Sequence, residues 1–304
     1  YQYPPRKYPV DKSLFNNGEN DIFIELYIAR NPGGLIEDKF YGIETDSLMI
    51  SFTNPWHIAC AGDHALSPMA YGTFWNRYPS TNYLAYLKDL KGFPIDALFW
   101  YQGESNGGNT LMYKRYLQQY IKNMQDDYGL DLPFFLIQLP KFEDPARGLG
   151  EDSWARLREV QREVAEELAS YLIVSIDLGE ANDLHPQDKW NLGKRCSDAY
   201  VQHEAGVSAV EANLCPREIE WAEDKVSIDF MKNIIVPQNI LQSFKACNQA
   251  QLVSLDSFEV FDTKLIIKAE GVFERLDYLY ENCPEDIYIV DENTKPYSPF
   301  SIKK

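Results

Sequence analysis

Two short polar stretches of the sequence hold residues whose types and spacing suit nucleophilic and acid–base chemistry. Gly103-Glu104-Ser105-Asn106-Gly107 fits G-x-S-x-G, a pattern that exposes a nucleophilic serine on a strand-to-helix turn. In that interpretation Ser105 attacks, His185 is the general base, and an Asp or Glu between them orients the imidazole. Short glycine-containing matches also occur in structural turns, and a histidine before proline is equally compatible with a loop histidine bonded to a carbonyl. The local pattern therefore leaves a hydrolase site and a structural turn open.

Both polar stretches follow runs that predict buried strands. Continuous apolar runs at 97–101, 134–139 and 171–176 alternate with segments of helical periodicity. These helical segments are 113–128, 154–168 and a third one that follows Pro186 and reaches Gln202. Strands that are apolar on both faces and alternate with helices are typical of a parallel sheet covered by helices. Ligands of such sheets bind outside the carboxyl ends of the strands, where both polar stretches lie.

The two ends of the chain show a different pattern, which predicts β-rich segments. Apolar and polar residues alternate at 22–28 and 48–52, the period of a half-buried strand. Beyond residue 205 no helical period continues, and further strands are expected at 258–261, 265–269, 276–280 and 287–290. The fold class is therefore α/β, with a parallel sheet flanked by helices and β-rich segments at both ends. The parts are expected at 1–72, 73–205 and 206–304.

Composition excludes several classes of protein. The 304 residues include 29 Lys and Arg against 46 Asp and Glu, which gives a net charge of −17 and argues against a nucleic-acid partner. No run of about 18 uncharged apolar residues occurs, so the sequence predicts no membrane span. Five scattered cysteines are too few for a disulfide scaffold and form no CxxC metal site. The chain opens at Tyr1 without Met, and we expect it to be a segment of a longer protein.

The longer strings around both stretches resemble the sialate O-acetylesterase family of the SGNH hydrolases. Trp100-Tyr-Gln-Gly-Glu-Ser-Asn106 resembles the hallmark of that family, and Asp183-Leu-His185-Pro186 resembles its catalytic-histidine block. The similarity covers nearly the whole chain. The further matching positions are Tyr3 to Tyr8, Tyr78-Pro79-Ser80 with Tyr83, Leu132-Pro133-Phe134 with Gln138-Leu139, Trp154 to Arg158 with Gln161, then Lys189, Gly193, Arg195 and Asn293 to Phe300.

This resemblance implies a role for each residue of the two stretches. His185 would be the general base and later the general acid, and the amide of Asn106 would donate to the oxyanion of the tetrahedral intermediate. Gly103 would allow close backbone approach, while Gln102 and Glu104 would shape the floor of the substrate pocket and brace its hydrogen bonds. The resemblance implies no metal and no organic cofactor.

Two members of the catalytic set depart from the family pattern. Related hydrolases place an Asp three residues before the His, where this chain has Asn182; Asp183 lies two residues before it. Either Asp183, which we prefer, completes the triad, or a Ser–His pair is braced by backbone carbonyls. The family's nucleophile is a Ser in a G-Q-S-N-M-like turn, and no such string occurs in residues 1–304. That Ser is therefore expected upstream of this chain.

The sequence thus predicts a carbohydrate O-acetylesterase that acts on an O-acetylated sugar, sialic acid or another glycan, by serine acyl-ester hydrolysis. Residues 1–72 would end an inserted β-sandwich-like domain, 73–205 would be the C-terminal part of the esterase domain, and 206–304 a C-terminal β-rich region. The alternatives are a catalytically inactive carbohydrate-binding fragment or subunit, and an α/β-hydrolase-type esterase that uses Ser105. Members of this layout are often exported, which favours a secreted or periplasmic full-length protein.

Because both stretches follow carboxyl ends of parallel strands, we expect the side chains of His185 and Asn106 to converge on one cleft.

Overall fold

The structure, a computed structural model, describes residues 10–18, 20, 42–45, 49–51, 94–129, 131–143, 150, 152–249 and 251–304. The chain divides into two compact units, one with residues 92–304 and one with residues 4–91. In the second unit the described strands β1 (Gly42–Glu44) and β2 (Met49–Ser51) pair antiparallel, with Ile43 opposite Ile50. The run at 48–52 is thus a strand in part, and the run at 22–28 lies outside the described residues.

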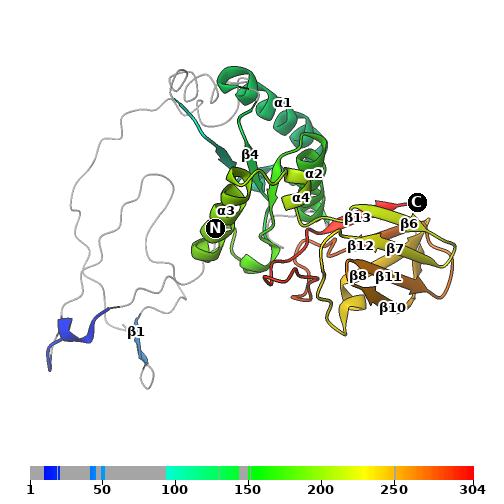
Figure 1. Ribbon diagram of the computed structural model, residues 1–304. Helices are drawn as coiled ribbons and strands as arrows, with labels where there is room; N and C mark the ends of the chain where they lie inside the picture. Colours follow the sequence, from blue (N-terminus) through cyan, green and yellow to red (C-terminus); the bar gives the residue numbers. More distant parts are fainter. Residues whose placement is uncertain are drawn as a thin grey trace. The chain divides into compact units, whose positions relative to one another are not determined.

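The three apolar runs in the middle of the chain form one parallel sheet, as predicted (Figure 1). Its order is β3-β4-β5, so β4 is central. The strands are shorter than the apolar runs: β3 spans Leu98–Trp100, β4 Phe134–Ile137 and β5 Tyr171–Ile173. Phe135 lies opposite Phe99 on one side and opposite Tyr171 on the other. The rings of Phe99 and Phe135 stack 4.5 Å apart, and those of Phe135 and Tyr171 4.7 Å apart.

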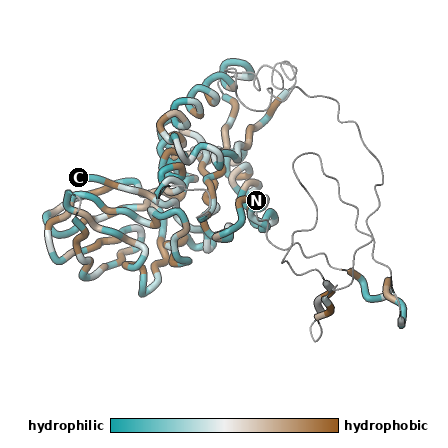
Figure 2. The backbone as a smooth tube through the Cα atoms, turned by 180° about the vertical axis from the view of Figure 1, so that it is seen from behind, coloured by the Kyte–Doolittle hydropathy of each residue, from teal (hydrophilic) through white to brown (hydrophobic). Residues whose placement is uncertain are grey.

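Helices cover both faces of this sheet because alternate strand residues point to opposite sides. Phe134 and Leu136 pack in a cluster with side chains of α1 (Thr110–Tyr128) and α2 (Ser153–Glu167). Phe135 and Ile137 belong to a second cluster, with side chains of α3 (Lys189–Glu204) and α4 (Ala209–Ala212). α1 buries one apolar stripe, whereas α2 is buried over most of its length. Along the chain, hydrophobic and hydrophilic segments alternate (Figure 2).

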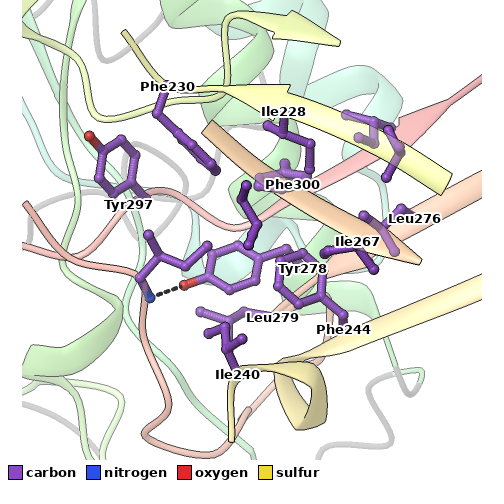
Figure 3. Packing of buried hydrophobic residues seen from close by; sticks show 14 of the residues in the cluster. Ile228, Phe230, Ile240, Phe244, Ile267, Leu276, Tyr278, Leu279, Tyr297 and Phe300 are labelled. Atoms are coloured by element: carbon purple, nitrogen blue, oxygen red, sulfur yellow. Dashed lines mark hydrogen bonds between the residues drawn. The ribbon is translucent and has the colours of Figure 1, made fainter. Parts of the chain in front are cut away.

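Eight antiparallel strands follow the helical part and form two four-stranded sheets. Their orders are β10-β11-β7-β6 and β13-β12-β8-β9. The strands are β6 (Glu218–Trp221), β7 (Lys225–Asp229), β8 (Phe244–Asn248), β9 (Gln251–Val253), β10 (Leu255–Phe261), β11 (Lys264–Ala269), β12 (Arg275–Tyr278) and β13 (Phe300–Lys303). One buried cluster takes side chains from both sheets, among them Ile228, Ile267, Phe244 and Phe300 (Figure 3).

Two expectations for this C-terminal part are wrong. A short helix, α4, follows residue 205, where Ser208 and Glu211 form a capping box at its start. The run at 287–290 is not a strand, although Ile289 within it is fully buried. The N–H of Ile289 donates to the hydroxyl of Tyr278 (2.7 Å); this bond is the dashed line at Tyr278 in Figure 3. Within the run only Val290 makes an isolated bridge, with Ile235 and with Pro296.

Within the described part of the chain, no helix has both the length and the apolar character that crossing a membrane requires.

The central position of Phe135 makes its ring a test of the sheet packing. Phe135 is 0% exposed and stacks between two other rings, so Phe135→Ala leaves a cavity and should lower the free energy of unfolding by about 3–5 kcal/mol. Leu252 on β9 is 73% exposed, and Leu252→Ala should change the free energy of unfolding by about 0.5 kcal/mol or less. Urea unfolding followed by circular dichroism measures both. Equal losses in the two variants would contradict the described packing.

Candidate active site

The turn after β3 is built around Gly103. Its φ is 151°, in the region that disfavours side chains, and a Cβ there would lie 3.0 Å from Leu139 Cδ1 and 3.2 Å from the hydroxyl of Tyr113. The Gly103 carbonyl accepts the N–H of Asn106 (2.8 Å), and the Glu104 carboxylate accepts the N–H of Gly103 (2.9 Å). Only a glycine fits this turn, which therefore brings the backbone close to the neighbouring elements.

The amide of Asn106 is held in one orientation by Gln102. Gln102 Nε2 donates to Asn106 Oδ1 (2.8 Å), so the Asn106 Nδ2 group is left to donate elsewhere. Asn109 then caps α1, because its side chain accepts the N–H of Met112. The Gln102 side chain therefore fixes the Asn106 amide, while its role in bracing a substrate pocket stays a prediction.

The loop after β5 carries Asp183 and His185. Asp183 is 3% exposed, and its carboxylate accepts the backbone N–H of His185 (2.8 Å), while Asn182 and His185 are exposed. This bond shapes the loop just before the imidazole. The Asp188 side chain accepts the N–H of Asn191 and so caps α3. Each candidate loop therefore leads into a capped helix.

Three contacts anchor the loop after β5 to its surroundings. The Arg195 guanidinium bonds the Asp177 carboxylate twice, at 2.6 Å each, and also donates to the carbonyl of Val174 (2.8 Å). The N–H of Glu143 donates to the carbonyl of Ala181 (2.7 Å), which ties this loop to the loop after β4.

Gly179 allows the same two loops to approach closely. A Cβ at Gly179 would lie 2.6 Å from Pro140 Cβ and 2.8 Å from the carbonyl oxygen of Lys141. The first distance is far below van der Waals contact. The loop after β5 therefore rests directly on the backbone that follows the central strand.

The start of α3 also reaches the turn after β3. Lys189 Nζ lies 5.5 Å from the ring centroid of Tyr101, a cation–π distance. Burial, and to a lesser degree the Glu104 carboxylate, raises the pKa of the Tyr101 phenol, which therefore stays neutral. These contacts bring the segments after the two outer strands to one edge of the sheet.

The structure gathers the predicted residues into two groups at that edge. Gln102, Gly103, Glu104 and Asn106 share the turn after β3, and Asp183 and His185 share the loop after β5. Convergence of the Asn106 and His185 side chains stays a prediction, as does an Asp183–imidazole pair.

Ser105 lies in the same turn as Asn106. It is exposed and belongs to the 3₁₀ helix Glu104–Asn106. Its φ is not positive, unlike that of six other non-glycine residues of the described chain. A strained backbone at the serine, which a nucleophile turn requires, is therefore missing at this position.

The sequence predicted no role for Gly179 and no contact between Lys189 and Tyr101. Neither has a local signal: a steric limit on Gly179 arises only when a loop about 40 residues away in sequence packs against it.

Residues 65–202 match the sequence model of the family described as carbohydrate esterase, sialic acid-specific acetylesterase. This match confirms the family resemblance and supports a carbohydrate esterase function. A comparison with curated proteins gives no match.

Among solved structures, the chain is similar to the crystal structure of XAC1771, a carbohydrate acetylesterase from Xanthomonas citri. The TM-score is 0.63 at 22% identity, over 71% of this chain and 52% of that one, so this chain spans about half the length of that protein. This likeness shows a shared fold. Two crystal structures of the bacterial S-layer protein SbsC also match, at 10% and 11% identity over 65% and 66% of this chain and 38% and 22% of theirs, with TM-scores of 0.25 and 0.26.

The contact at Gly179 generates a test of the loop packing. Gly179→Ala forces the backbone near Pro140 and Lys141 to shift, and should lower the free energy of unfolding by about 1–3 kcal/mol. Gly193→Ala is the matched control: this exposed helical glycine has no atom within 4 Å of the place where a Cβ would lie, so the change should stabilise by about 0.4–1 kcal/mol. Thermal and urea unfolding measure both. A Gly179→Ala variant as stable as the unchanged chain would contradict the close approach.

Proposed function

We propose that this chain is part of an SGNH-type serine esterase that removes O-acetyl groups from a sugar, sialic acid being the first substrate to test. The observation that carries the proposal is the fixed amide of Asn106. Its Oδ1 accepts from Gln102, and its Nδ2, which makes no hydrogen bond within the described residues, can donate at the edge of the sheet where His185 also lies. The family match at residues 65–202 supports the same chemistry.

The reaction runs in two acyl transfers. A serine hydroxyl attacks the acetyl carbonyl while His185 takes its proton, and the carbonyl electrons move onto the oxygen. Asn106 Nδ2 and backbone N–H groups stabilise this oxyanion. Collapse of the intermediate expels the sugar oxygen, which receives the proton from His185 and leaves an acetyl-serine. Water then attacks with His185 again as base, and acetate leaves as the serine regains its proton.

The other site residues position these groups. Asp183 shapes the loop of His185 and stabilises the imidazolium, while Gln102 and Glu104 form the floor of the substrate pocket. The attacking serine belongs to a G-Q-S-N-like turn N-terminal to this chain. Support for this comes from the exposed, unstrained Ser105 and from the missing turn in residues 1–304. No metal takes part, and the full-length protein is secreted or periplasmic.

The role of His185 is tested in the full-length protein. Because the imidazole moves the proton in both steps, His185→Ala should lower kcat by roughly 10²–10⁴ with little change in KM. Acetate release from an O-acetylated sialic acid and from p-nitrophenyl acetate measures this. His203→Ala is the control, since His203 bonds the hydroxyl of Tyr171 away from this edge. Full turnover in His185→Ala would show that the base is another residue.

The role of Ser105 is tested with the chain and the full-length protein side by side. Ser105 shares a turn with Asn106, so its hydroxyl should not attack the carbonyl whose oxygen that amide binds. We expect residues 1–304 alone to hydrolyse p-nitrophenyl acetate no faster than the denatured chain. In the full-length protein Ser105→Ala should keep most of the activity, whereas alanine at the upstream serine should leave only residual catalysis. Activity of residues 1–304 that disappears in Ser105→Ala would instead establish Ser105 as the nucleophile.

A further inference from the structure

One fully buried side chain joins the turn after β3 to the loop after β4. Gln161 on α2 is 0% exposed and uses both ends of its amide. Its Oε1 accepts the N–H of Leu139 (2.9 Å), and its Nε2 donates to the carbonyl of Gln102 (3.1 Å) and lies 3.3 Å from the hydroxyl of Tyr113. A single amide therefore links two segments that leave neighbouring strands of the sheet.

The link to the turn after β3 ends at Asn106. The Gln102 carbonyl accepts both from Gln161 and from the hydroxyl of Tyr113 (2.7 Å), so the backbone of Gln102 is fixed from the α1 and α2 side. The side chain of Gln102 in turn holds the Asn106 amide. A shift of Gln102 would therefore move the group that is to bind the oxyanion.

The link to the loop after β4 continues towards His185. Beyond Leu139, the Pro140 ring and the Lys141 backbone pack on Gly179, and the N–H of Glu143 donates to the carbonyl of Ala181. Two residues later, Asp183 accepts the backbone N–H of His185. The position of the imidazole loop is thus set against the same segment that Gln161 holds.

We propose that Gln161 is a positioning residue, which sets the separation between the oxyanion donor Asn106 and the base His185. The inference rests on the proposed function for the roles of these two groups, but the geometric link does not. Gln161 itself touches neither the sugar nor the acetyl group. Catalysis is sensitive to such a residue because a misplacement of about 1 Å in the reacting groups costs up to about 100-fold in rate.

The first arm of the test uses turnover by the full-length protein. Gln161→Met keeps the volume and removes all three side-chain hydrogen bonds, and should lower kcat roughly 10- to 100-fold on p-nitrophenyl acetate while KM stays unchanged. Gln118→Met is the matched control: Gln118 also bridges α1 to α2, through Glu167 (2.6 Å), but on the exposed side, and its variant should keep full turnover. An unchanged kcat in Gln161→Met overturns the inference.

A double-mutant cycle separates positioning from a general loss of structure. If Gln161 acts through Asn106, the change Gln161→Met should cost much less in an Asn106→Ala background than in the unchanged protein. Equal costs in both backgrounds would assign Gln161 a purely structural role. Tyr113→Phe removes one hydroxyl from the same Gln102 carbonyl and should show the same coupling, so it decides the question if Gln161→Met does not fold.

The second arm does not depend on any activity. Hydrogen exchange of residues 1–304 should become faster in Gln161→Met at both 101–109 and 138–143, and at neither segment in Gln118→Met. Faster exchange at both segments without esterase activity in the full-length protein would reject the proposed function and keep the positioning role. Faster exchange at one segment or neither would overturn the positioning role itself.

Discussion

The backbone that follows the central strand stays buried after the sheet has ended, and most of the site is arranged around this constraint. The N–H of Gln138 still bonds the carbonyl of Ile173 (2.9 Å), but the chain then runs on past the strands while Gln138 and Leu139 remain 0% exposed. Buried N–H and C=O groups without partners are costly, so side chains must supply the missing bonds. The partners are Ser175 for the Gln138 carbonyl, Gln161 for the Leu139 N–H, and Trp154 and Arg158 for the Pro140 carbonyl. This need explains why Arg158 and Gln161 are buried on α2.

Arg158 supplies partners for several buried backbone carbonyls at once. Its guanidinium is fully buried, and its hydrogen bonds in the described part of the chain all go to backbone carbonyls, those of Pro140, Glu281 and Asn282. Burial lowers the pKa of Arg158 to about 9, which reflects the cost of removing the charge from water. A neutral side chain has too few donors to reach three carbonyls at once. The loop after β4 and the segment at 281–282 are therefore joined through α2.

The sequence was informative where one residue and its near neighbours decide the structure. Continuous apolar runs predicted the three parallel strands and a period of 3.6 predicted their helices, because both signals of burial show within a few residues. The apolar run at 287–290 wrongly predicted a strand: Ile289 is buried, but its N–H donates to the Tyr278 hydroxyl and not to a neighbouring strand. Hydropathy records burial and does not record where backbone hydrogen bonds go.

The same distinction applies to the candidate site, where some features follow from local sequence and others from distant contacts. The turn that holds Gly103 and Asn106 could be placed from its position after a strand, since the carboxyl ends of parallel strands share one edge. The groups that hold it could not, because Tyr113 and Gln161 reach Gln102 from 11 and 59 residues away in sequence. No local pattern connects positions 59 residues apart, although Gln161 is one of the positions that match the family resemblance.

The spacing of the sheet limits where an acetyl group would sit under the proposed function. Neighbouring strands lie about 4.8 Å apart, so β3 and β5, on either side of β4, are about 10 Å apart. An oxyanion donor and a base must each come within about 3 Å of the reacting atoms. Side chains from the two outer loops can meet this requirement only above the end of β4. The backbone beneath that point is the buried segment at 138–140, which is held in place by the hydrogen bonds that burial demands. The central strand would then contribute no reacting group, and its task would be to hold the two outer loops at a fixed distance.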